Sequence, residues 1–194
     1  SLRRALVIFQ CVIAQALIIV TLVVAAQMNY FRNADLGFNK NAVINAGIPG
    51  DSLSRTKMNV LYNELSKLHG VKDVSFSTFA PGNSGWYTDL RTPENHTKTN
   101  PDMVVAMMPA DTNYFHLYDL QLAAGRIYFP SDTMREFVVN ETIARNLGYK
   151  DPQQAIGKMI NVNGSLCPIV GVVKNFNASS LRDSIGPVVL STMK

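Results

Sequence analysis

The chain has 194 residues, of which 47% are hydrophobic and 16% are charged, and its formal net charge is +4. Arg3 and Arg4 supply two of the 18 basic residues, so 16 basic residues face 14 acidic ones from Gln27 onward. These charges form no basic stripe, which argues against nucleic-acid binding. The two cysteines, Cys11 and Cys167, provide no disulfide framework, so the hydrophobic core must stabilise the fold.

An apolar segment without any charged residue runs over the 22 positions from Ala5 to Ala26. As a helix it would be ~33 Å long, which is enough to cross a hydrocarbon layer of about 30 Å. Arg3 and Arg4 predict that its start is cytoplasmic. We expect residues 1–26 to be a transmembrane helix with its cytoplasmic flank, in contact with the lipid bilayer, and the later chain to lie outside. A signal peptide and a buried core helix are the alternatives.

Small and polar residues recur at helical spacing within this segment. Gln10, Ala14, Leu17 and Thr21 share one stripe, and Gln15 lies beside it. Such residues allow close helix packing and hydrogen bonds in lipid. We expect Gln10, Ala14, Gln15 and Thr21 to pack against another membrane helix, although a simple anchor would also tolerate two glutamines.

Residues 27–41 form a polar stem after the apolar segment. Tyr30 and Phe31 stand where aromatic residues mark a membrane interface, and together with Gln27 they are the candidate stem residues. We expect the helix to continue through the stem and Gly37 to end it. Residues 42–48 are expected to form a short strand.

An amphipathic helix is predicted next, because apolar residues recur at i, i+3, i+7 and i+10. These residues are Met58, Leu61, Leu65 and Leu68. Their spacing predicts one buried face. Candidate N-caps are Asp51, Ser52 and Ser54, and Gly70 fits the position after the helix end. Residues 71–79 alternate and predict a strand, with Val71, Val74, Phe76 and Phe79 as candidates for burial.

Residues 80–102 are rich in Gly, Pro, Asn and Thr and hold the only tryptophan, Trp86. A structureless loop of this length is unusual in a compact domain, so we expect a strand over 86–91 within an inserted lobe. Trp86, Tyr87 and Asp89 are the candidate contacts for a substrate or partner. The alternative is that the aromatic residues form the small core of that lobe.

The remaining pattern predicts further strands and two short helices. Strands are expected over residues 103–108, 120–125, 137–139, 158–162, 165–173 and 185–190. Asp111 and Asn140 are expected to cap the helices, and Asn163-Gly164 is a strong hairpin signal. This mixed order indicates an α+β fold, a mixed α/β domain of two lobes with one β-rich and inserted.

No catalytic motif emerges from the sequence. Gly157-Lys158 has no upstream glycine at the spacing of a phosphate-binding P-loop, so ATP hydrolysis by this chain is not expected. The three histidines, at 69, 96 and 116, are far apart and lack partners at metal-ligand spacing. Ser54 and Lys57 match Ser-x-x-Lys without the accompanying motifs, which favours a helix cap. We predict no enzyme, no cofactor and no metal site.

Several stretches together resemble the extracytoplasmic core domain of MacB/FtsX-like ABC transporter permeases. They are Leu2-Arg3-Arg4-Ala5-Leu6-Val7 with Phe9-Gln10, Asp35-Leu36-Gly37-Phe38, Tyr114-Phe115 with Leu120 and Gly125-Arg126, Val138-Val139-Asn140-Glu141 with Ala144, Ile156-Gly157-Lys158, and Ile169 to Phe176 followed by Ser180-Leu181-Arg182 and Pro187. The resemblance covers nearly the whole chain, as residues 1–26, the stem at 27–41 and a core domain at 42–194. Residues 80–102 match no pattern of the family.

The resemblance implies a permease subunit in the bacterial inner membrane with its folded domain in the periplasm. It implies a cytoplasmic ATP-binding partner, other permease helices or a second permease copy, and mechanotransmission from ATP hydrolysis to export or release. A periplasmic adaptor, a lipoprotein or a hydrophobic peptide would be the outer partner or substrate. Because the chain begins at Ser1 and reaches Lys194 directly after a strand, we expect a longer protein with further membrane helices.

Two other functions fit an anchored outer domain. A ligand-sensing domain would signal inward and be followed by a signalling module, whereas an anchored hydrolase would turn over a substrate. The sequence after Lys194 separates a sensor from a permease, and a hydrolase assay tests the second alternative.

Overall fold

A computed structural model describes residues 2–39, 41–49, 57–83, 85–93, 103–180 and 183–193. The chain divides into two compact units, Ser1–Asp35 and Leu36–Lys194. The first unit holds the helix α1, and the second holds the sheet and the shorter helices. The candidate N-caps Asp51, Ser52 and Ser54 lie outside the described residues, as do residues 94–102, which include His96.

Helix α1 spans Leu2–Asn33 and has no buried residue. Within the part of the chain that is described, it is the one helix long and apolar enough to cross a membrane. It continues seven residues past Ala26, as predicted for the stem. The expectation that Gly37 ends the helix is wrong, because α1 ends at Asn33 and Gly37 has a separate packing role.

The second unit contains seven strands in its described residues. They are β1 Trp86–Arg91, β2 Met103–Ala110, β3 Leu122–Gly125, β4 Phe137–Asn140, β5 Met159–Val162, β6 Ser165–Val173 and β7 Val188–Thr192. The helices are α3 Met58–Ser66, α4 Asn113–Leu117, α5 Glu141–Asn146 and the short 3-10 helix η1 Pro152–Ala155. This order confirms the prediction of a mixed α/β domain after an apolar helix.

The strands form one sheet in the order β3-β6-β4-β7-β2-β1-β5, and β5 also pairs with β6. Six strands close into a ring because β6 is long enough to serve two neighbours. Its first half pairs with β5 and its second half pairs with β3 and β4. The pairs β2–β7 and β4–β6 are parallel, and the other pairs are antiparallel.

Two hydrophobic clusters lie on opposite faces of the sheet, as the alternation of side chains along β2 demonstrates. Val105 and Met107 belong to one cluster, which α5 and η1 cover. Ala106 and Met108 belong to the other, which α4 covers. Burial on both faces explains why β2 reads as a nearly continuous apolar run.

Three local predictions are confirmed. Asn163 and Gly164 both have positive φ, 51° and 80°, and connect β5 to β6 as a tight hairpin. Asn140 caps α5 by accepting a hydrogen bond from the amide of Ile143. A strand forms at Trp86–Arg91, but it pairs with β2 and β5 in the main sheet. The described residues of 80–102 thus extend that sheet, where a separate inserted lobe was expected.

Two predicted strands do not form. Residues 42–48 have no strand partner, and Ile44 is 92% exposed. Residues 71–79 make only an isolated bridge, between Ser77 and Ala110. The carboxylate of Asp111 holds this segment instead, since it accepts hydrogen bonds from the Ser75 hydroxyl and the Phe76 amide, each at 2.7 Å.

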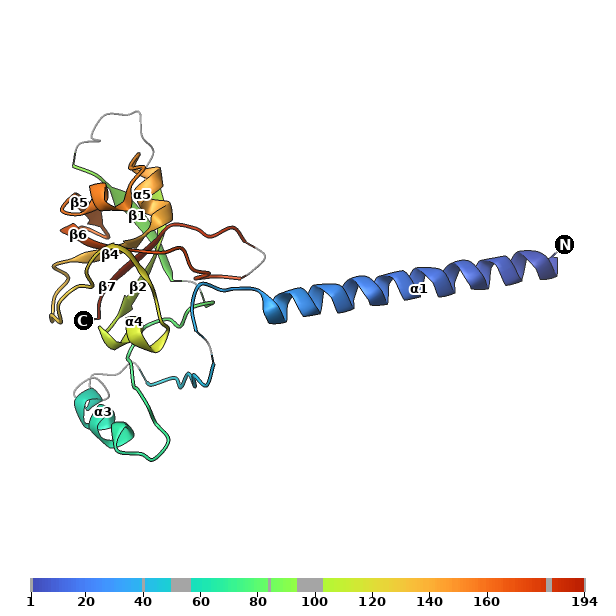
Figure 1. Cartoon of the computed structure of the whole chain (residues 1–194), viewed down its shortest axis with the longest axis horizontal. Helices are drawn as coiled ribbons and strands as arrows, with labels where there is room; N and C mark the ends of the chain where they lie inside the picture. The colour runs from blue at the N-terminus through green and yellow to red at the C-terminus, as the bar shows by residue number, and fades with distance from the viewer. Residues whose placement is uncertain are drawn as a thin grey trace. The chain divides into compact units, whose positions relative to one another are not determined.

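Helix α3 forms as predicted, but its apolar face is not buried. Leu61 and Leu65 are half-buried, and Leu68 is 55% exposed. The helix lies apart from the strands (Figure 1). It ends at Ser66, so Gly70, with φ +95°, lies in the turn beyond the expected position.

Candidate functional site

The residues that follow the first unit are fastened to the domain, and we call Leu36 to Asn39 the attachment segment. The carbonyl of Leu36 accepts hydrogen bonds from the backbone amide of Asn177 at 2.8 Å and from its side-chain amide at 3.3 Å. One asparagine thus binds the same carbonyl twice. This grips the chain at the first residue of the domain.

Gly37 fits the attachment segment because it has no side chain. A Cβ at this position would lie 2.7 Å from the carbonyl oxygen of Asn175 and 2.8 Å from the Cα of Phe176. Its φ of +73° also favours glycine. The backbone therefore approaches the 175–176 loop more closely than any other residue type would allow.

Tyr118 contacts the second half of the attachment segment, Phe38 and Asn39. Its ring meets Phe38 edge-on at 6.0 Å between centroids, and its carbonyl accepts a 2.8 Å hydrogen bond from the amide of Asn39. Its hydroxyl donates to the side-chain oxygen of Asn45 at 2.9 Å. Burial raises the pKa of Tyr118, and the Asn45 hydrogen bond partly offsets that rise. The neutral phenol thus remains available as a donor.

A hydrogen-bonded path leads from the attachment segment into the sheet. The backbone amide of Asn175 donates to the carboxylate of Glu141 at 3.0 Å, and its side-chain oxygen accepts from the backbone amide of Thr142 at 3.1 Å. The buried Asn140 accepts from the amides of Ile143 and Val188, at 3.2 and 3.1 Å. The start of α5 therefore links the loop after β6 to β7.

A second feature is an exposed stripe of side chains across four strands, which we call the outer face. Asp89 lies opposite Val104, and Asn161 lies opposite both Arg91 and Leu166. Directly opposed residues share one side of a sheet, and Tyr87 shares it by alternation. Tyr87, Val104 and Leu166 are 66%, 55% and 54% exposed.

Of the predicted contact residues, Tyr87 and Asp89 lie on the outer face. Asp89 makes an ion pair with Arg91 at 3.7 Å. Trp86 is 53% exposed and meets Phe79 edge-on at 5.7 Å between ring centroids. Trp86 thus packs against its own domain and also exposes part of its side chain. A role in partner contact and a role in local packing therefore both stay predictions.

The other predicted site residues lie along α1. Gln10, Ala14 and Gln15 are exposed, and the Thr21 hydroxyl donates to the carbonyl of Leu17 at 2.8 Å within the same helix. Gln27 is also exposed, and Tyr30 and Phe31 meet edge-on at 6.0 Å. Their roles in helix packing and in the stem remain predictions.

The charged cluster around Arg126 stabilises a loop. Its guanidinium binds the carboxylate of Glu136 through both terminal nitrogens and lies 4.1 Å from the ring centroid of Phe129. The hydrogen bond from Arg126 lowers the pKa of Glu136, and the amide of Phe129 adds to this effect. Within the described ranges, no cluster of three or more metal-ligating side chains occurs.

Comparison with known proteins defines the class. The family model described as MacB-like periplasmic core domain matches residues 5–193. The chain belongs to this family, which confirms the resemblance to MacB/FtsX-like ABC transporter permeases. A search of curated proteins finds no match.

Solved structures similar to this chain include two outer domains of transporters. One is the extracellular domain of the noncanonic ABC-type transporter YknZ from Gram-positive bacteria, with 16% identity, a TM-score of 0.47 and 68% of this chain covered. Another is the periplasmic region of MacB from Actinobacillus actinomycetemcomitans, with 18% identity, a TM-score of 0.46 and 68% covered. The chain spans 59% and 52% of the lengths of these two chains.

Proposed function

We propose that this chain is a membrane helix and the outer domain that follows it in an ABC transporter permease subunit of the bacterial inner membrane. The domain would couple ATP hydrolysis by a cytoplasmic ATP-binding partner to export or release of a substrate in the periplasm. Membership of the MacB-like periplasmic core domain family carries the proposal. The proposal is also supported by helix α1, which runs without a break beyond the apolar segment and could carry a movement out of the membrane.

The proposed mechanism is transmission of movement. A helix resists bending as long as its hydrogen-bond ladder is intact, so a displacement of the membrane helices would reach the stem. The attachment segment would pass it on through the contacts of Leu36 with Asn177. From there the path through Asn175 and the start of α5 would move the sheet.

A proline in the stem tests this mechanism. Asn29→Pro removes a hydrogen bond of α1 and kinks it, at a cost of about 3 kcal/mol in a helix interior. In the complete permease with its ATPase, we expect transport to fall about tenfold or more while ATP hydrolysis persists. Asn29→Ala is the matched control and keeps the helix. Unchanged transport in the proline variant would refute transmission of movement through the stem.

We further propose that the outer face and Trp86 contact the substrate or an outer partner, such as a periplasmic adaptor, a lipoprotein or a hydrophobic peptide. Exposed aromatic residues often carry much of the binding energy at interfaces. The exposed side chains of Tyr87, Val104 and Leu166 share the outer face with the ion pair between Asp89 and Arg91.

Tyr87→Ala tests the outer face without disturbing the core. Because Tyr87 is 66% exposed, we expect the unfolding free energy to change by less than about 0.5 kcal/mol. Transport should fall about fivefold or more if the residue is an anchor worth about 1 kcal/mol. Phe129→Ala, which removes a ring of similar exposure, should leave transport intact. An equal effect of both variants would contradict this role.

A further inference from the structure

Residues 41–79, which we call the arm, lie in the chain between the attachment segment and β1. Among the described residues of the arm, 41–49 and 57–79, none is buried, and the first buried residue along the described chain is Leu90. A segment without buried side chains can separate from its domain without opening the hydrophobic core. The contacts at the two ends of the arm therefore decide whether it stays in place.

The far end of the arm is held by several hydrogen bonds. The carboxylate of Asp111 accepts one from the hydroxyl of Ser75 and one from the amide of Phe76, each at 2.7 Å. The hydroxyl of the buried Tyr114 donates to the carbonyl of Phe79 at 3.1 Å. These bonds fix this end of the arm at the start of α4.

The near end of the arm is held through Tyr118, which directly follows α4. The hydroxyl of Tyr118 donates to the side-chain oxygen of Asn45 at 2.9 Å. Val43 packs against the hydrophobic cluster that α4 covers, whereas Ile44, between these two residues, is 92% exposed. Val43 and Asn45 thus face the domain and Ile44 faces away, as alternation along an extended chain requires. Loss of the hydroxyl contact would weaken the hold on this end.

Tyr118 binds the attachment segment as well. Its carbonyl accepts the amide of Asn39, and its ring meets Phe38 edge-on. One buried residue therefore holds the attachment segment through its backbone and ring and holds the arm through its hydroxyl. A hydrogen bond weakens steeply once its distance and angle depart from the ideal. A displacement of the attachment segment that shifts Tyr118 would thus break its contact with Asn45.

We propose that Tyr118 is a positioning residue that couples the arm to the attachment segment. When that segment is displaced, the hydroxyl of Tyr118 loses Asn45, and the near end of the arm is released while Asp111 keeps the far end. This coupling does not depend on transport. Its use in a transport cycle rests on the proposed function, in which a movement of α1 displaces the attachment segment.

The test measures release of the arm by thiol modification of the full chain in maltoside micelles. Val43→Cys, in a Cys11→Ser background, places a reporter thiol at the half-buried near end. Its rate of reaction with iodoacetamide rises with the fraction of molecules in which this end is released. The buried Cys167 of the same chain reports opening of the core, and peptide mass spectrometry separates the two thiols.

Tyr118→Phe keeps the ring and removes the hydroxyl. We expect it to raise the modification rate at position 43 about fivefold, as loss of one hydrogen bond predicts, while Cys167 stays unmodified over the same period. Tyr128→Phe is the matched control, because it removes the phenol hydrogen bond to the carbonyl of Ala110. It lies outside the proposed coupling and should change the rate less than about twofold. Equal effects of the two variants would overturn the proposal.

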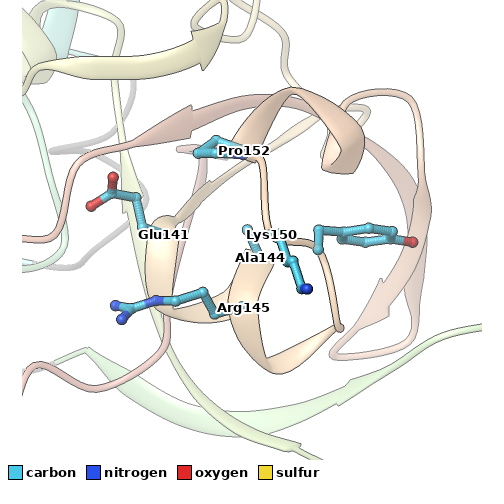
Figure 2. Close-up of a pocket in the computed structure, with 6 residues that line it drawn as sticks. Glu141, Ala144, Arg145, Lys150 and Pro152 are labelled. Atoms are coloured by element: carbon cyan, nitrogen blue, oxygen red, sulfur yellow. The ribbon is translucent and has the colours of Figure 1, made fainter.

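Gly37→Ala supplies the displacement of the attachment segment. Its Cβ would lie 2.7 Å from the carbonyl oxygen of Asn175. The backbone amide of Asn175 donates to the carboxylate of Glu141, which extends from the start of α5 and points away from Lys150 (Figure 2). Because this anchor holds the 175–176 loop in place, the attachment segment must yield to the added side chain.

We expect Gly37→Ala to raise the modification rate at position 43 about fivefold or more. Combining it with Tyr118→Phe should add less than about twofold to the larger single effect, because both substitutions break the same contact. A double variant that shows the product of the single effects, no rise with Gly37→Ala, or an equal rise at Cys167 would each overturn the coupling. The measurement needs no ATPase, so a failure of the proposed transport mechanism would leave its result standing.

Discussion

Asn140→Ala is expected to lower the unfolding free energy by about 2–4 kcal/mol. Asn140 is fully buried, and its oxygen accepts hydrogen bonds from the amides of Ile143 and Val188. Its amide donates to the carbonyl of Gly186 at 2.8 Å. Alanine would leave these three backbone groups without this partner, and the amides of Ile143 and Val188 belong to buried residues. Their desolvation cost adds to the loss of the cap on α5.

Chemical denaturation of the full chain in micelles measures this effect. Asn146→Ala is the matched control, because Asn146 is exposed on the same helix, and it should change the unfolding free energy by less than about 0.5 kcal/mol. Asn140→Asp should fall between them, since a carboxylate accepts both amides but cannot donate to Gly186. If Asn140→Ala were as mild as the control, Asn140 would not join α5 to β7.

Gly37→Ala is the second substitution with a large expected effect. The added Cβ would meet Asn175 and Phe176 at 2.7 and 2.8 Å, and the φ of +73° disfavours any side chain. We expect the unfolding free energy to fall by about 1–3 kcal/mol and transport by the complete permease to fall with it, because the attachment segment must move away from the 175–176 loop.

Two glycines separate the causes of this effect. Gly70→Ala has a similarly strained φ of +95° but open space around it, and Gly47→Ala has open space without a positive φ. We expect Gly70→Ala to cost about 1 kcal/mol and Gly47→Ala to be neutral, with transport preserved in both. Should Gly70→Ala match Gly37→Ala in both measurements, backbone strain alone would explain the result and the close packing would not matter.

The sequence predicts those elements whose signals are local. The uncharged run of α1, the alternation of the later strands and the turn residues Asn163-Gly164 each act on neighbouring residues, and all form as expected. Residues 42–48 and 71–79 have the composition of strands, yet a strand forms only where a neighbouring strand pairs with it through backbone hydrogen bonds. For residues 71–79, Asp111 and Asn113 supply side-chain hydrogen bonds instead.

The contacts of the attachment segment could not be predicted from the sequence for a related reason. Leu36 and Asn177 meet across 141 positions, and no spacing rule links residues so far apart. Gly37 did carry a signal, but a glycine after a helix is more simply explained as its end. The outer face was found only in part: Tyr87 and Asp89 were predicted from composition, whereas Leu166 joins them through the pairing of β5 with β1 and β6.

The proposed function requires that α1 crosses the membrane and that the domain lies outside it. Thiol labelling with a membrane-impermeant maleimide tests this claim in a Cys11→Ser background, where the remaining Cys167 is buried. Val60→Cys, on exposed α3, should be labelled in intact right-side-out spheroplasts. Leu2→Cys should be labelled only after the membrane is permeabilised. Labelling of Val60→Cys only after permeabilisation would place the domain in the cytoplasm and contradict the proposed function.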